Sequence, residues 1–125
     1  MRLGLLALFA ACFALPSCVA KSHPSSPQAQ ARVLAAEQRD FDAASGHSRV
    51  AKSLVDSYRI DSEVLTILVQ RAVWDRLGTA KQDDAKRSIW ELWRAAYVRH
   101  NPETSDRPFL KVEDLQGNDL GSYFQ

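Results

Sequence analysis

Both cysteines of this 125-residue chain, Cys12 and Cys18, lie in an N-terminal segment unlike the rest of the sequence. Residues 3–15 form an apolar run that is preceded by a single charged side chain, Arg2. A run of about a dozen residues is shorter than the roughly 20 that span a bilayer, and the pattern is typical of an export signal. If this segment is removed at Cys18, the remaining chain must fold without a disulfide.

The residues around Cys18 resemble a bacterial lipobox. In Leu15-Pro16-Ser17-Cys18 an aliphatic residue stands three positions before the cysteine and a small residue directly before it. The resemblance implies a lipoprotein acylated at Cys18, with palmitate among its lipids, that is anchored in the outer membrane or elsewhere in the envelope and faces the periplasm. Three alternatives stay open: cleavage after Ala20 to give a soluble periplasmic or secreted protein, a second lipobox at Cys12, and an uncleaved anchor.

The charges of the chain are balanced. It has 16 Lys and Arg against 15 Asp and Glu, with 46% hydrophobic and 25% charged residues, which is ordinary for a globular protein. Removal of Arg2 leaves 15 basic and 15 acidic residues. No net field attracts a polyanion, so we expect no nucleic-acid partner.

The composition predicts three parts: an export signal over residues 1–17, the attachment cysteine with a polar tether over 18–27, and a single helical domain over 28–125. An Ala-rich stretch predicts a first helix over 28–44, which Gly46 ends. Apolar residues at helical spacing predict a shorter helix over 50–58.

The strongest structural signal lies between Asp61 and Tyr97. Apolar residues cover most sides of a predicted helix over 61–78, and Gly78 stops it. A capping box of Thr79 and Gln82 starts a second helix over 80–100. We therefore expect a mainly α fold, a small bundle of three to four helices around a central helical hairpin.

The C-terminal region predicts one short extended segment. Asn101-Pro102 ends the preceding helix, because the residue before proline is disfavoured in α conformation. Apolar residues at 109–115 predict a strand, and Gly117-Asn118-Asp119 is a turn signal.

No catalytic or metal-binding pattern is found in the sequence. The histidines stand alone, without a second ligand at helical spacing: His23, His47 and His100. Asp83 and Asp84, near Asp75, are candidate acid–base carboxylates of a cell-wall enzyme, but the helix macrodipole also favours acidic residues at a helix start. We expect a protein that is not an enzyme and that uses neither cofactor nor metal.

Four aromatic residues lie close together in the sequence: Trp74, Trp90, Trp93 and Tyr97. They predict either a core of large side chains or a ligand- or partner-binding edge near Trp90 and Tyr97. Periodicity places Trp93 inside the apolar stripe, which favours the core.

Residues 60–77, 79–84 and 89–97 resemble the helical hairpin of the periplasmic phospholipid-shuttle family (MlaC, or toluene-tolerance auxiliary proteins), and residues 109–123 resemble its last strand. The resemblance implies a fold that encloses an acyl chain between helices and a sheet, without catalytic residues.

These features predict a non-enzymatic lipoprotein of the cell envelope. Its lipid attaches it to the membrane, and its helical domain binds an apolar ligand, such as a phospholipid, or a protein partner. The alternative is a periplasmic immunity or inhibitor lipoprotein that neutralises a toxic enzyme.

Overall fold

The computed structural model describes residues 26–125, which form helices packed on a four-stranded mixed sheet. The elements in chain order are α1 Pro27–Gly46, α2 Arg49–Leu54, β1 Ser57–Asp61, β2 Val64–Val69, α3 Arg71–Leu77, α4 Thr79–His100, β3 Phe109–Asp114 and β4 Asp119–Tyr123. The fold is therefore α/β, and the expectation of a mainly α helical bundle was wrong.

The error lies in the segment predicted as one helix over 61–78. It contains the end of β1, the strand β2 and the short helix α3. A short run of apolar residues suits a buried strand as well as a buried helix, and four of the six residues of β2 are β-branched. Likewise, the helix predicted over 50–58 ends at Leu54, and Tyr58 lies in β1.

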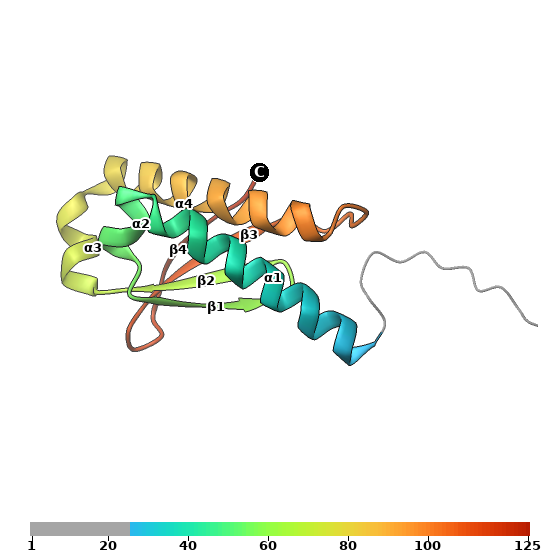
Figure 1. The fold of residues 1–125 in the computed structure, drawn as a ribbon. Helices are drawn as coiled ribbons and strands as arrows, with labels where there is room; N and C mark the ends of the chain where they lie inside the picture. Colours follow the sequence, from blue (N-terminus) through green and yellow to red (C-terminus); the bar gives the residue numbers. More distant parts are fainter. Residues whose placement is uncertain (1–25) are drawn as a thin grey trace, which may run out of the picture.

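The sheet has the strand order β1-β2-β3-β4. β1 and β2 form an antiparallel hairpin, β3 and β4 form a second one, and the central strands β2 and β3 run parallel. A parallel pair needs a crossover, which α3 and α4 supply. Figure 1 shows the helices together on one side of the strands.

Local signals set the helix ends. The Ser26 hydroxyl accepts a hydrogen bond from the amide of Ala29 at 3.0 Å and caps α1. Gly78, at φ 79°, separates α3 from α4, as its place in the sequence predicted. The predicted capping box was wrong, because Gln82 donates to the carbonyl of Trp74 at 2.9 Å and so ties α4 to α3.

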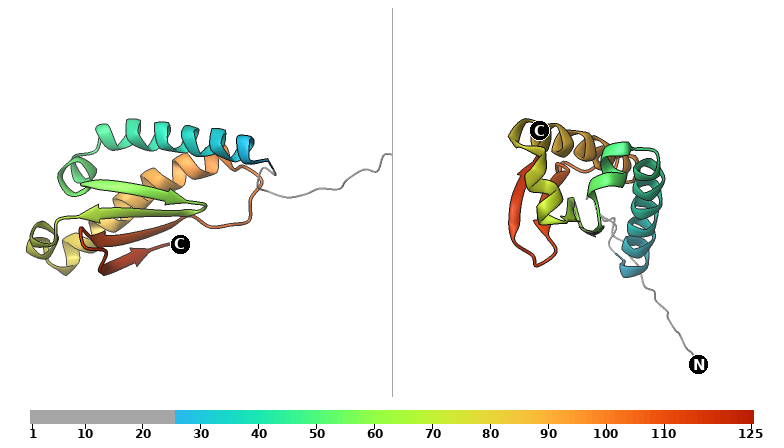
Figure 2. Two further views of the ribbon diagram at one scale, coloured as in Figure 1. Left: turned by 90° about the horizontal axis from the view of Figure 1, so that it is seen from below. Right: turned by 90° about the vertical axis from the view of Figure 1, so that its left-hand side faces the viewer.

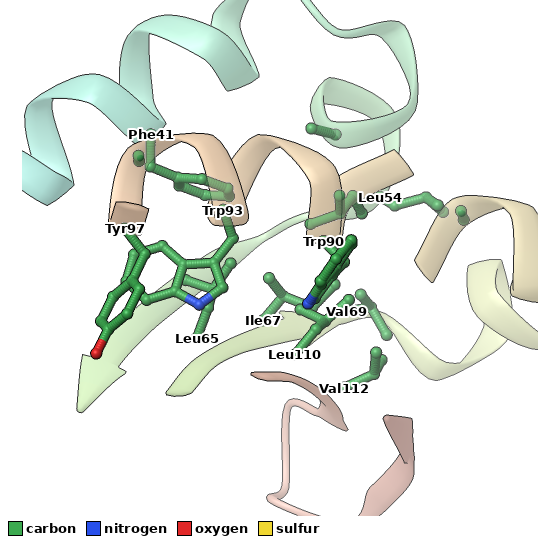
Figure 3. Close-up of a cluster of buried hydrophobic side chains, with 14 of the residues drawn as sticks. Phe41, Leu54, Leu65, Ile67, Val69, Trp90, Trp93, Tyr97, Leu110 and Val112 are labelled. Carbon is green, nitrogen blue, oxygen red and sulfur yellow. The ribbon is translucent and has the colours of Figure 1, made fainter. Parts of the chain in front are cut away.

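The hydrophobic core lies between the helices and the sheet. Figure 3 shows aromatic side chains of α4 above aliphatic side chains of the two central strands, with one ring from α1 closing the cluster. The buried side chains labelled there include Phe41, Trp90, Trp93, Tyr97, Leu65, Ile67, Val69, Leu110 and Val112. The predicted aromatic core is thus packed between a sheet and other helices.

The opposite face of the sheet carries no helix of the described region. Seen from below, the strands lie in front of α4 (Figure 2, left). Alternation along β2 places Leu65, Ile67 and Val69 in the core, so Thr66 and Leu68 point to this second face. The protein is therefore a two-layer structure with one uncovered sheet face.

Candidate functional site

The four aromatic residues predicted as a binding set are core residues in the structure. Trp74 lies on α3, the other three lie on α4, and all are between 0 and 4% exposed. The rings of Trp93 and Tyr97 are 5.4 Å apart, and Trp90 is 5.4 Å from the ring of Tyr123. Within residues 26–125, no ring contact joins Trp74 to the others.

The indole groups of α4 also have hydrogen-bond partners. Trp90 Nε1 donates to the carbonyl of Pro108 at 2.9 Å, and Trp93 Nε1 donates to the carbonyl of Glu63 at 3.0 Å. These bonds fasten α4 to the segment before β3 and to the β1–β2 turn. The apolar surface of each indole is therefore buried in the core, and its N–H group is hydrogen-bonded within the fold.

A pocket of about 360 Å³ lies at the end of the sheet next to Tyr97. Its walls come from the first half of α1, the end of β1 with the following turn, and the last turns of α4. The lining residues are Gln30, Val33, Leu34, Glu37, Ile60, Asp61, Ser62, Tyr97 and Asn101. We call this the Glu37 pocket.

Glu37 and Asn101 form a buried polar pair in this pocket. Glu37 is 4% exposed, and its Oε2 accepts a hydrogen bond from Asn101 Nδ2 at 2.6 Å. Asn101 Nδ2 also donates to the carbonyl of Tyr97 at 2.8 Å, and Asn101 is the C-cap of α4. One amide therefore closes α4 and holds the carboxylate of α1 in place.

Tyr97 also lines the pocket, and its side chain carries a buried hydroxyl. Its oxygen is buried and has no hydrogen-bond partner of good geometry among the described residues, although the Thr104 side chain is a polar neighbour. Burial raises the pKa of this phenol above its usual value. Figure 3 shows the hydroxyl pointing away from the indoles of the cluster. A buried hydroxyl that lacks a well-aligned hydrogen-bond partner costs free energy.

A second pair of contacts braces the helices beside the pocket. Asp40 Oδ2 lies 2.7 Å from His100 Nε2 and 3.3 Å from Arg99 Nη1. The hydrogen bond from His100 lowers the pKa of Asp40. The basic groups at this end of α4 are thus engaged with Asp40, one turn beyond Glu37 on α1.

The rim of the pocket contains a backbone feature. Asp61 pairs with Val64 across the two-residue turn Ser62-Glu63, and Ser62 has φ 58°. Glycine is the residue that usually occupies such a position. Ser62 and the neighbouring Asp61 are exposed residues of the pocket lining, and the positive φ of Ser62 costs free energy.

The candidate acid–base carboxylates Asp75, Asp83 and Asp84 are exposed, and the first two make local ion pairs. Asp83 contacts Lys86 at 3.2 Å, and Asp75 contacts Arg71 at 3.5 Å. Across residues 26–125, no group of three or more His, Cys, Asp or Glu side chains is arranged to hold a metal ion.

The uncovered sheet face is the other surface of interest. Phe109 and Phe124 stack there with ring centroids 5.4 Å apart, and Phe124 is 60% exposed. Further along β3, Glu113 receives a contact from Arg59 at 3.0 Å and one from Lys111 at 3.7 Å. This face combines an exposed aromatic pair with a small network of charges.

Of the aromatic residues predicted as a site, the structure places Tyr97 in the Glu37 pocket, and Trp90 beside a separate hollow with Arg94 and Arg107. Sequence reasoning missed Glu37 and Asn101. A signal for Glu37 exists, because it falls on the same helix face as Val33, Leu34 and Phe41, where a carboxylate is out of place.

No family model matches the chain, and neither the curated proteins nor the solved structures include a significant match to it. The predicted export signal, Cys18 and most of the tether lie outside the described residues. In residues 26–125 no helix is long and apolar enough to cross a membrane. The phospholipid-shuttle resemblance stays a prediction, although residues 60–77, which it took as helix, contain the end of β1, strand β2 and the short helix α3.

Proposed function

We propose that this protein is a non-enzymatic, lipid-anchored protein of the bacterial envelope that binds a small amphipathic ligand in the Glu37 pocket. The observation that carries the proposal is the lining of the pocket, which combines the aliphatic side chains of Val33, Leu34 and Ile60 with the buried Glu37–Asn101 pair. Binding sites typically combine an apolar wall with a few placed polar groups.

The volume of the pocket limits the size of the ligand. A volume of about 360 Å³ is near the lower end of the range for small-molecule sites, about 300–1,000 Å³. Such a pocket suits a compact molecule with one apolar part better than a phospholipid with two acyl chains. The proposal therefore keeps the predicted apolar ligand but favours a smaller one.

Ligand binding is tested by native mass spectrometry of the protein purified from its own host. Val33 is half-buried in the pocket wall, and Val33→Phe fills the cavity from α1. Ala31→Phe adds a ring on the exposed side of the same helix and is the matched control. We expect a bound small molecule with the wild type and Ala31→Phe that is lost with Val33→Phe. Equal ligand content in all three proteins would place the ligand elsewhere, and protein without any ligand would contradict the proposal.

The envelope part of the proposal rests on the sequence around Cys18 alone. Mass spectrometry of the mature N-terminus should show an acylated Cys18, and Cys18→Ala should abolish the acylation. A mature chain that begins after Ala20 without lipid would support secretion and reject the anchor.

The uncovered sheet face supports a second candidate, an immunity or inhibitor protein that binds a toxic enzyme. The exposed Phe124, stacked on Phe109, offers an aromatic anchor of the kind found at protein interfaces. Phe124→Asp should then abolish protection of cells against the toxin, whereas Leu115→Asp, at another exposed apolar position, should not. Protection that survives Phe124→Asp would reject this role for the face.

A further inference from the structure

The two halves of α1 differ in how they are packed. Glu37 and Phe41 are the buried residues of this helix, and none of residues 27–36 is buried. Most of the stability of a helix in a folded protein comes from the packing of its apolar side chains. Resting on the proposed ligand-binding role, we propose that residues 27–36 are a flap that opens and closes the Glu37 pocket while residues 37–46 stay in place. We call residues 27–36 the α1 flap.

The second half of α1 is attached to β1. Phe41 has no exposed surface, and its ring lies 4.9 Å from the ring of Tyr58 in an edge-on arrangement. The Tyr58 hydroxyl donates a hydrogen bond to Asp42 Oδ1 at 2.5 Å. This part of the helix therefore combines a buried aromatic contact with a polar one to the same strand.

The second half of α1 is also attached to the end of α4. Asp40 Oδ2 lies 2.7 Å from His100 Nε2, and Glu37 Oε2 accepts the 2.6 Å hydrogen bond from Asn101. Glu37 is the first residue of α1 that is buried. The structure thus sets the boundary between the flap and the attached half of the helix at Glu37.

The α1 flap forms one side of the Glu37 pocket. Gln30, Val33 and Leu34 of the flap line it, and the end of β1 and the end of α4 supply lining residues on other sides. In both Figure 1 and Figure 2 (left) the first turns of α1, drawn in blue, extend past the ends of the strands. An outward movement of the flap therefore widens the pocket without moving the sheet or α4.

The apolar residues of the flap connect its position to ligand binding. Segments with few buried apolar side chains open at a lower free energy than the whole fold. Val33 and Leu34 are half-buried on the pocket side, so an apolar ligand between them and the sheet would cover their remaining surface. A bound ligand should therefore favour the closed flap.

Amide hydrogen exchange of the full mature chain, followed by NMR at pH 7, tests the flap. In an α-helix the amides of residues 31–36 donate to carbonyls of residues 27–32, so their exchange reports on the flap, whereas the amides of residues 41–46 report on the attached half. We expect exchange at 31–36 to be at least about tenfold faster than at 41–46, after correction for intrinsic rates, and to change little in low urea. Equal protection and equal urea dependence in both halves would overturn the flap.

Two glycine substitutions at exposed positions of α1 separate local opening from opening of the whole helix. Ala35→Gly lies in the flap and Ala43→Gly in the attached half. Ala35→Gly should speed exchange at 31–36 by about fivefold, and Ala43→Gly should leave it unchanged. An equal increase at 31–36 in both variants would show that α1 opens as one unit and would overturn the boundary at Glu37.

Hexanol, a short amphipathic probe, tests whether the flap controls the pocket. At ten times its Kd it should slow exchange at 31–36 by about tenfold, because it binds the closed state. Val33→Phe, which fills the cavity, should remove this effect. If hexanol shifts the amides of residues 60–62 and 97–101 but leaves exchange at 31–36 unchanged, the flap is overturned and the proposed binding function stands. If hexanol leaves those amide shifts unchanged, the binding function and the inference are overturned together.

Discussion

Trp93 is a large side chain packed between the helix layer and the sheet. It has no exposed surface, and its indole nitrogen donates to Glu63 in the β1–β2 turn. Trp93→Ala should lower the free energy of unfolding by about 3–5 kcal/mol, as for other large-to-small core changes. Trp93→Phe keeps most of the ring and loses the hydrogen bond, so it should cost about 1–2 kcal/mol. Urea unfolding followed by circular dichroism checks both values, and a loss under 1 kcal/mol with Trp93→Ala would contradict the core assignment.

Two aspartates should make the fold sensitive to acid. Hydrogen bonds lower the pKa of Asp40, chiefly from His100, and that of Asp114, chiefly from Asn118, below the ordinary value of 3.8. Because each pKa is lower in the folded state than in the unfolded chain, the two aspartates add to the free energy of unfolding above about pH 4. This contribution is lost as the pH falls through the folded-state values.

Thermal unfolding midpoints between pH 6 and pH 2.5 test this effect. The unfolding temperature of the wild type should decrease as the pH is lowered below about 4. Asp40→Asn and Asp114→Asn should each make this decrease smaller. Asp75→Asn, at an exposed i,i+4 pair, should leave the slope as it is. An unchanged slope in both aspartate variants would reject the two carboxylates as its source.

The β1–β2 turn, an element of two residues, carries backbone strain at Ser62. Ser62→Gly relieves the positive φ but gives the unfolded chain more freedom, so the two effects partly cancel. We expect a gain in unfolding free energy of up to about 1 kcal/mol for Ser62→Gly and no gain for Ser62→Ala. Chemical denaturation measures the pair, and a clear loss with glycine would show that the Ser62 hydroxyl stabilises the fold.

The helices were easier to predict than the strands because their signals are local. Helices α1 (Pro27–Gly46) and α4 (Thr79–His100) agree with the predictions over 28–44 and 80–100, because the periodic apolar residues lie within each segment and Gly46 and Asn101-Pro102 mark the ends. Strand β2 takes its identity from β3, whose residues pair with it from more than 40 positions away, Val64 with Phe109. An isolated apolar run carries no information about that partner.

At the scale of the whole molecule, the two-layer arrangement brings together segments that the sequence keeps apart. Residues 30–37, 60–62 and 97–101 meet in the Glu37 pocket. The four aromatic residues were predicted as a candidate binding set because they are large and close together in the sequence. In the structure their side chains fill the space between the two layers. Tyr97 alone among them belongs both to the core and to this pocket, which is why sequence reasoning reached one member of the site and missed the polar pair beside it.

The central claim is that ligands bind at the Glu37 pocket and not at the tryptophan edge or on the uncovered sheet face. Mapping of backbone amide shifts upon titration with hexanol, a short amphipathic probe, tests this most directly, with Val33→Phe and Ala31→Phe in parallel. We predict changes centred on residues 30–37, 60–62 and 97–101 that Val33→Phe abolishes and Ala31→Phe preserves. Changes centred instead on Trp90 and Arg107, or on Thr66 and Phe109, would contradict the account.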